Sequence, residues 1–90
     1  MRLDLFLKAS RLVKRRSVAR ELCDIGRVLV NSHPSKPAKE VKRGDRVMLQ
    51  FNTRSLELEV LDLPLSSKKI DPVLLYRVTS EKREVRDDNE

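Results

Sequence analysis

The chain has 90 residues, which is enough for one small domain but too few for two independent cores. Apolar residues make up 39% and aromatics only 3%, with no Trp, so we expect a thin core of Leu, Val and Ile with two Phe. The single cysteine excludes an internal disulfide. No apolar run is long enough for a membrane span or signal-peptide core, so we expect a cytoplasmic protein.

Positive charge is concentrated at the start of the chain. The net charge is +6, and residues 1–20 contain seven Lys and Arg against the single acid Asp4. The rest of the chain has equal numbers of positive and negative side chains. This pattern predicts one basic face and a polyanionic partner. A membrane surface is a weaker candidate than RNA, because residues 2–20 lack the Trp- and Phe-rich face of interfacial helices.

Two short helices are predicted first. Leu3, Phe6 and Leu7 have helical spacing, which indicates a helix over residues 3–9. Ser17 is a plausible N-cap for a second helix that runs to about Ile25.

The second helix has its apolar residues at positions i, i+4 and i+7. These are Val18, Leu22 and Ile25, and we expect them to be buried with Ala19 beside them. Gly26 then fits the left-handed residue that ends a helix.

Short strands follow the helices. Residues 27–31 read as a strand, whereas the two prolines within 32–37 disfavour a helix or a central strand there. After a turn at 42–45, residues 47–51 and 56–60 alternate apolar and polar side chains, which predicts an antiparallel hairpin packed on the helices.

We place the end of the domain near residue 63 and a C-terminal extension at 64–90. A polar connector over 64–71 leads to residues 73–78, for which the sequence allows a helical turn or a strand. From Ser80 onward the chain is almost wholly charged, so we expect a disordered or frayed tail. The predicted fold class is α+β: two helices packed on a small antiparallel sheet, with a flexible C-terminal tail.

The basic run Lys14, Arg15 and Arg16 is the strongest candidate site. It leads into the second helix, where positive side chains would converge with unpaired backbone N–H groups, an arrangement that binds phosphate. A mixture of Arg and Lys suits backbone recognition more than base reading. Few aromatics are available for stacking, which favours folded, double-helical or junction RNA over single strands.

Other candidates for chemistry are weak. His33 has no metal-ligand partner at suitable spacing, and Cys23 is more typical of a small core residue than of a nucleophile. Asp4 fits a role in capping the first helix or orienting arginines. We therefore predict no catalytic residue, cofactor, metal or small-molecule substrate, and no enzyme.

Several segments of the chain together resemble the S4-type RNA-binding domain, also called the alpha-L motif. The resemblance covers residues 1 to about 51 and is carried by 1–19, 26–31, Lys36-Pro37 and 41–45. Within that family the whole chain is similar to the short stand-alone RqcP family of ribosome-associated quality-control factors. The resemblance implies binding to obstructed large ribosomal subunits that carry peptidyl-tRNA, contacts to ribosomal RNA and tRNA, and support of alanine tailing by an RqcH-like factor.

The resemblance also implies which residues contact RNA. Arg2 and Arg16 would be the leading contacts, supported by Arg11, Lys14, Arg15 and Lys36. One departure concerns the turn after the first strand, because Ser32 follows Asn31 where the family commonly has Gly. A non-Gly residue reaches positive φ only at a cost, and a different turn would displace Lys36.

Four alternatives remain open from the sequence. The basic run could be merely a solvated face, or the chain could be a nonspecific nucleic-acid binder. It could also act like the larger heat-shock protein of the family, which it resembles in the N-terminal half and which recycles large subunits bearing nascent chains. Finally, it could be a protein-interaction adaptor that uses residues 73–78 and the charged tail.

Overall fold

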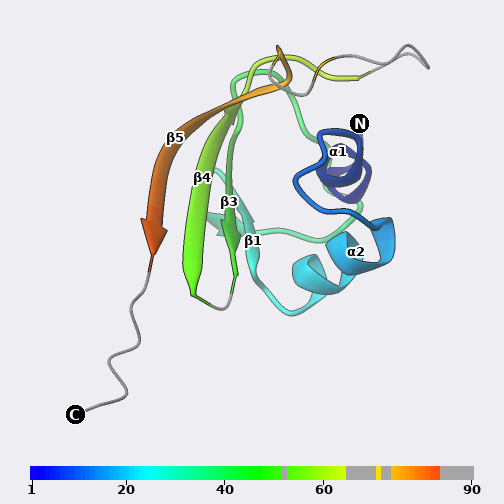
Figure 1. Ribbon diagram of the computed structural model, residues 1–90. Helices are drawn as coiled ribbons and strands as arrows, with labels where there is room; N and C mark the ends of the chain where they lie inside the picture. The colour runs from blue at the N-terminus through cyan, green and yellow to red at the C-terminus, as the bar shows by residue number, and fades with distance from the viewer. Residues whose placement is uncertain (52, 65–70, 72–73, 84–90) are drawn as a thin grey trace.

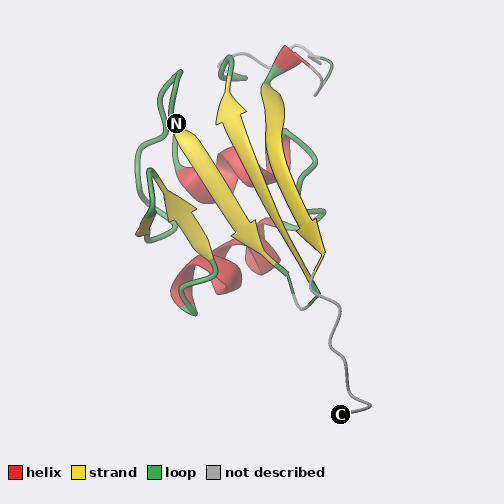
Figure 2. Ribbon diagram, turned by 90° about the vertical axis from the view of Figure 1, so that its left-hand side faces the viewer, coloured by secondary structure: helices red, strands yellow, loops and turns green. Residues whose placement is uncertain are grey.

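Two helices cover one face of a five-stranded antiparallel sheet in the computed structural model (Figure 1; Figure 2). The structure describes residues 1–51, 53–64, 71 and 74–83. The helices are α1 (Leu3–Ala9) and α2 (Arg16–Asp24). The sheet order is β2-β1-β3-β4-β5. The strands are β1 (Val28–Val30), β2 (His33–Pro34), β3 (Arg46–Gln50), β4 (Arg54–Val60) and β5 (Tyr76–Arg83). The predicted α+β class is confirmed.

The core lies between the sheet and the helices. Val47 pairs with Leu58 and Leu49 with Leu56 across the β3–β4 hairpin, and all four side chains are buried. Phe6 fills the space beneath them from α1. Because side chains alternate across a strand, Met48 and Glu57, which lie between these apolar positions, face the other side of the sheet.

α1 ends at a buried serine. The hydroxyl of Ser10, which is fully buried, donates to the carbonyl of Phe6 over 2.7 Å. Arg11 follows at φ +62°, and its N–H donates to the carbonyl of Lys8 over 3.0 Å. This left-handed residue ends the helix as a glycine commonly does, although an arginine there costs conformational free energy.

Two predictions about α2 were wrong. Ser17 is not the N-cap: Arg15 takes that position, with no side-chain hydrogen bond, and Ser17 lies in the first turn. The predicted buried face is also wrong, because Val18 is 42% exposed and Ile25 58% exposed. The helix ends at Asp24, and Gly26 has φ +79°, as expected of the stop.

Small residues form the buried face of α2. Ala19 and Cys23 are one helical turn apart and both are buried, whereas Leu22 is only partly buried. Short side chains let α2 lie close to its neighbours, and this packing decides which face is covered. The apolar stripe that the sequence shows is therefore left largely at the surface.

The β1–β2 connection is a tight turn with two left-handed residues. Asn31 has φ +51° and Ser32 has φ +72°, between paired Val30 and His33. Two positive φ values are what a two-residue hairpin turn of this kind requires. The side chain of Asn31 also braces the turn, donating to Asp45 over 3.1 Å and accepting from the Arg46 N–H over 3.0 Å. Ser32 thus adopts the positive φ that favours glycine.

The C-terminal strand corrects a further prediction. The disordered or frayed tail expected from Ser80 onward does not begin there, because residues 80–83 belong to β5, which pairs with β4 along its length. Leu75, just before β5, is only 1% exposed. These residues form a strand because they hydrogen-bond to β4, and their local sequence alone does not indicate it. The remaining tail at 84–90 and most of the connector at 64–71 lie outside the described residues, as does Val73.

Within the described residues, neither helix has the length and apolar character needed to cross a bilayer.

Candidate nucleic-acid interface

Arg2 and Arg16 meet at one buried carboxylate. The Nε of Arg2 lies 3.2 Å from Oδ1 of Asp4, and the Nε of Arg16 lies 3.2 Å from Oδ2. Asp4 is 0% exposed and also accepts the backbone N–H of Leu5 over 2.8 Å. We call these three residues, Arg2, Asp4 and Arg16, the arginine cluster. Asp4 therefore orients arginines, as the sequence suggested, and satisfies one N–H group in the first turn of α1.

The arginine cluster presents fixed positive charge to solvent. The side chains of Arg2 and Arg16 are 46% and 43% exposed, so each guanidinium is anchored on one edge and open on another. Arg binds phosphate oxygens through a planar fork of N–H groups, and a fork held in place loses less freedom on binding. Such a pair is suited to a phosphate backbone.

The charge state of Asp4 follows from its partners. Burial by itself would raise the pKa of this carboxyl, but the hydrogen bonds from Arg16 and Arg2 and the backbone N–H of Leu5 outweigh burial. Together with the charge of Arg16 they lower the pKa below its ordinary value of 3.8. Asp4 is thus ionised at neutral pH and forms an ion pair with each of the two arginines.

The beginning of α2 is an open, positively charged helix end. Its N-cap Arg15 makes no side-chain capping bond, and the first turn contains no acidic residue. The helix dipole already places partial positive charge there, so Arg15 and Arg16 add to it unfavourably. An anion would relieve both effects, which supports the predicted phosphate-binding character although the predicted cap was wrong.

The loop after β2 packs against the start of α1. The carbonyls of Lys39 and Pro37 accept the N–H groups of Leu3 (2.8 Å) and Asp4 (3.1 Å). Lys36 closes the same loop, since its carbonyl accepts the N–H of Lys39 over 3.0 Å. The structure therefore brings the exposed residues Lys36 and Lys39 to the side of the arginine cluster.

No sequence pattern indicated that Lys39 lies near the arginine cluster. Its position two residues after Pro37 gave no periodic signal, and only the backbone hydrogen bond to Leu3 shows that it lies beside Arg2.

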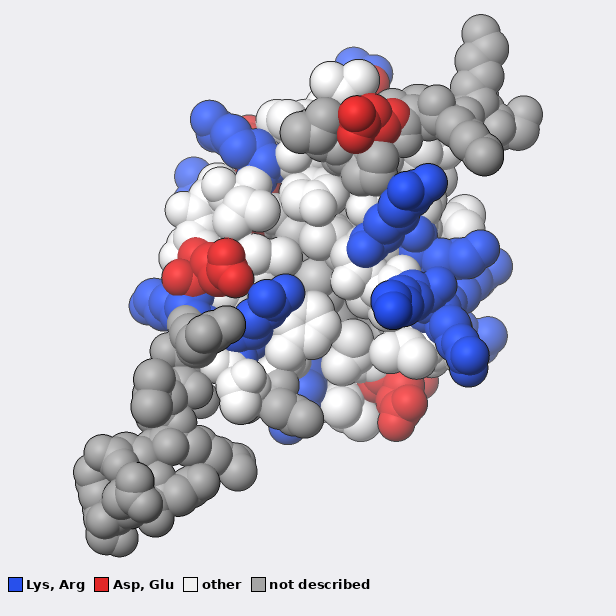
Figure 3. Space-filling model, viewed as in Figure 1, with Lys and Arg blue, Asp and Glu red and all other residues white. Residues whose placement is uncertain are grey.

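The other predicted contacts lie elsewhere on the surface. Arg11 is exposed in the turn at the far end of α1 from Arg2. Lys14 and Arg15 are exposed in the connection between the helices, at the margin of an open groove. Figure 3 shows a large group of Lys and Arg atoms on the side of the molecule where the helices lie in Figure 1. The predicted residues are thus exposed at several places and do not line one pocket.

His33 and Cys23 show no sign of a reactive site. His33 is exposed in β2, and the described residues contain no group of three or more His, Cys, Asp or Glu that could hold a metal. Cys23 is buried, and burial, followed by the charges of Asp4 and Asp24, raises the pKa of its thiol to about 11. It behaves as a small core residue.

Comparison with known proteins gives a consistent result. Residues 1–47 match the S4 domain family. The chain is 42% identical over 83 residues to the RQC P-site tRNA stabilizing factor of Streptococcus pneumoniae, covering 92% of this chain and 94% of that protein. It is 37% identical over 83 residues to the protein of that name from Bacillus subtilis, covering 92% and 96%. Among solved structures, the trimeric Vibrio cholerae heat shock protein 15 superposes with a TM-score of 0.77 at 30% identity, covering 89% of this chain and 82% of that one.

Proposed function

This chain belongs to the S4 domain family, and on that premise we propose that it is an RNA-binding ribosome quality-control factor that holds tRNA. The observation that supports this most directly is the arginine cluster, in which one buried carboxylate fixes two half-exposed guanidinium groups. The protein acts by binding, with no chemical step of its own. Its place of action is the cytoplasm, on the ribosome.

The mechanism is electrostatic and geometric. Arg2 and Arg16 bind phosphates of structured RNA in a pose set by Asp4, and Lys36 extends the contact from the neighbouring loop. Arg11, Lys14 and Arg15 add positive charge around this centre. Because the positions are fixed before binding, the surface favours one RNA shape over a flexible strand.

The finer role is part of the proposal and rests on the family resemblance, while the relatives' name, RQC P-site tRNA stabilizing factor, supports only its quality-control and tRNA parts. The chain binds obstructed large ribosomal subunits through peptidyl-tRNA and ribosomal RNA. In that position it supports alanine tailing of the stalled chain by an RqcH-like factor.

Co-sedimentation tests the proposal. The protein is mixed with purified large subunits, with and without bound peptidyl-tRNA, beside the variant Arg2→Ala/Arg16→Ala. The matched control is Arg77→Ala/Lys82→Ala, which also removes two exposed positive charges. Both residues lie on β5, the strand at one edge of the sheet (Figure 1). We expect binding to increase with peptidyl-tRNA, to be lost in the first variant and to persist in the control. Equal losses in both variants would mean that only total charge matters and would refute a specific site.

The likeness to heat shock protein 15 supports a second candidate, a factor that recycles large subunits. A reconstituted tailing reaction with the RqcH-like factor separates the two functions. Stimulation of tailing supports the quality-control role, whereas release of the nascent chain without tailing supports recycling.

A further inference from the structure

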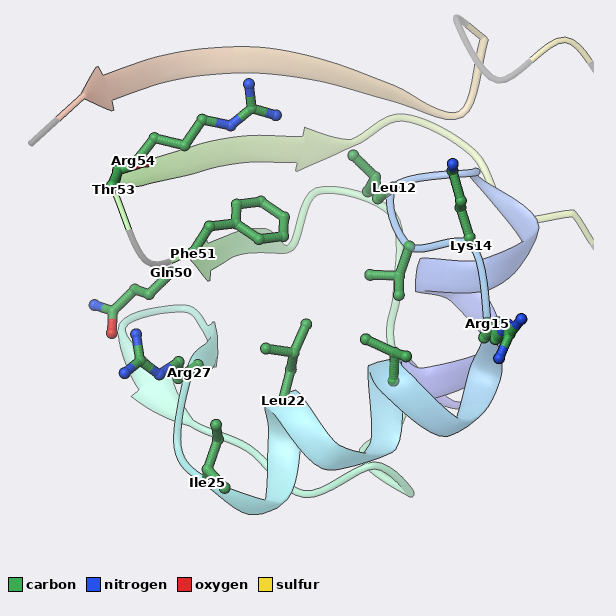
Figure 4. A pocket seen from close by; sticks show the side chains of 12 residues that line it. Leu12, Lys14, Arg15, Leu22, Ile25, Arg27, Gln50, Phe51, Thr53 and Arg54 are labelled. Carbon is green, nitrogen blue, oxygen red and sulfur yellow. The ribbon is translucent and has the colours of Figure 1, made fainter.

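An open groove lies between α2 and the end of the β3–β4 hairpin, with a volume of about 970 Å³. Its floor is apolar: Leu12, Leu22 and Phe51 are partly buried, and Val18 and Ile25 are 42% and 58% exposed. Figure 4 shows Leu12, Leu22 and Phe51 pointing into the same hollow. An amphipathic helix normally turns such large apolar residues toward the core, but in α2 it is Ala19 and Cys23 that face the core. Leu22 is partly covered by the core, whereas Val18 and Ile25 are left largely exposed.

The margin of the groove is positively charged. Lys14, Arg15, Arg27 and Arg54 line it, and none of the described residues that line it is Asp or Glu. In the described part of the chain, Lys14, Arg15 and Arg27 form no ion pair, and Arg54 reaches Glu81 only at 3.6 Å. A complementary occupant would therefore combine an apolar surface with negative charge.

Two kinds of occupant combine these properties, an unstacked RNA base with its phosphates and an acidic protein segment. The geometry disfavours the base. Phe51 is the one aromatic residue among the described lining residues, and the Cζ of Arg54 lies over its ring, 5.5 Å from the centroid. One face of that ring is already covered, so a base could stack there only if Arg54 moved, and the rest of the floor is aliphatic.

The floor matches a helix. Val18 and Leu22 of α2 and Ile25 at its C-cap have the spacing i, i+4 and i+7, and a second helix packs along such residues with anchors at the same spacing. We propose that the groove is a docking site for an amphipathic helix of a partner protein, with Leu or Ile at helical spacing and Glu or Asp flanking them. The arginine cluster does not line the groove, but Lys14 and Arg15 belong both to the groove margin and to the proposed RNA-binding surface, so the test must separate the two functions.

Titration with a defined peptide tests the proposal. The probe is a synthetic helix of about 18 residues with Leu at i, i+3, i+4 and i+7 and Glu on the flanks, long enough to be partly helical alone. Binding is followed by NMR chemical shifts of the full chain. We expect shifts centred on Leu22 and Phe51, and no comparable shifts with a peptide whose Glu residues are replaced by Lys.

The variant Val18→Ser/Ile25→Ser separates groove binding from general attraction of charge, since it changes no charge and both side chains are exposed. We expect peptide affinity to fall about tenfold and tRNA affinity to stay within about twofold. The control Leu74→Ser changes an apolar side chain, 61% exposed, that does not line the groove, and should bind the peptide normally. Peptide binding that is absent, or that the double variant leaves unchanged, overturns the proposal. Loss of tRNA binding in the double variant would assign the groove to RNA and also overturn it, while leaving the role of the arginine cluster intact.

Discussion

The Nε of Arg16 donates to Oδ2 of Asp4 over 3.2 Å, and this contact ties the first turn of α2 to the first turn of α1. Because Asp4 is fully buried while Arg16 is half exposed, the contact has both a structural and a binding consequence. The carboxylate stabilises the helix pair, and the arginine is held where RNA can reach it.

Replacing Asp4 by Asn should weaken both folding and RNA binding. The amide keeps the shape but loses charge-assisted hydrogen bonds from Arg2 and Arg16, so we expect a loss of about 1–3 kcal/mol in the free energy of unfolding. Urea denaturation at pH 7 measures it. The control Asp62→Asn changes an exposed carboxyl and should have a much smaller effect. Similar effects in both variants would contradict the assigned role.

The pH dependence gives a separate check on Asp4. Its pKa is lowered in the folded state from 3.8, so its contribution to stability is present above 3.8 and is lost as the pH falls through the lower, folded-state pKa. The wild type should therefore lose stability on acidification below 3.8 more steeply than Asp4→Asn. Parallel curves for the two proteins would be inconsistent with the lowered pKa.

Replacing Arg16 by Ala should weaken RNA binding and reduce its dependence on salt. Losing one phosphate contact lowers the slope of log affinity against log salt by about one unit. Fluorescence anisotropy with a labelled tRNA over a series of salt concentrations measures the slope. Arg77→Ala, on β5, should leave it unchanged. An unchanged slope in Arg16→Ala would remove this residue from the RNA contacts.

Replacing Ser32 by Gly should stabilise the protein. Ser32 has φ +72°, where glycine has no steric penalty, and we expect a gain of about 0.5–1 kcal/mol after allowing for the greater freedom of glycine in the unfolded chain. Chemical denaturation gives the difference. Ser80→Gly, within β5, should be destabilising instead. A loss of stability in Ser32→Gly would show that the side chain contributes more than its strain costs.

Replacing Leu75 by Ala tests whether the chain beyond residue 63 belongs to the folded unit. Leu75 is 1% exposed and precedes β5, so its truncation should cost about 2–4 kcal/mol. The neighbouring Leu74→Ala, at a position 61% exposed, should change stability by about 0.5 kcal/mol or less. An equally small effect at Leu75 would support a domain that ends near residue 63. Truncation after Leu63 would remove β5, the strand paired with β4, and would disturb the fold. It therefore cannot show whether the C-terminal residues bind a partner protein.

The thiol of Cys23 should be unreactive in the folded protein. Burial raises its pKa to about 11, so little thiolate exists at pH 8, and reaction with an aromatic disulfide reagent should be slow until urea unfolds the chain. A Cys23→Ala/Ile25→Cys variant, with the thiol at a 58% exposed position, should react quickly without urea. Equally fast reaction of native Cys23 would mean that α2 opens readily from the core.

Features that depend on neighbouring residues could be predicted from the amino-acid sequence. The apolar spacing in residues 3–9 gave α1, Gly26 gave the end of α2, and alternation around Val47 and Leu58 gave the β3–β4 hairpin. Each depends on a helical or strand period or on one backbone angle, and these are encoded over a few residues. The positive charge of the N-terminal segment was equally visible without a structure.

Contacts between distant segments could not be predicted in this way. The buried face of α2 depends on how closely Ala19 and Cys23 let it approach, and β5 depends on hydrogen bonds to β4, more than fifteen residues away in the chain (Val60 pairs with Tyr76). The arginine cluster likewise joins Arg2 and Arg16 through Asp4 only because the two helices pack together. Packing and strand pairing act between segments distant in sequence, so no local pattern contains them.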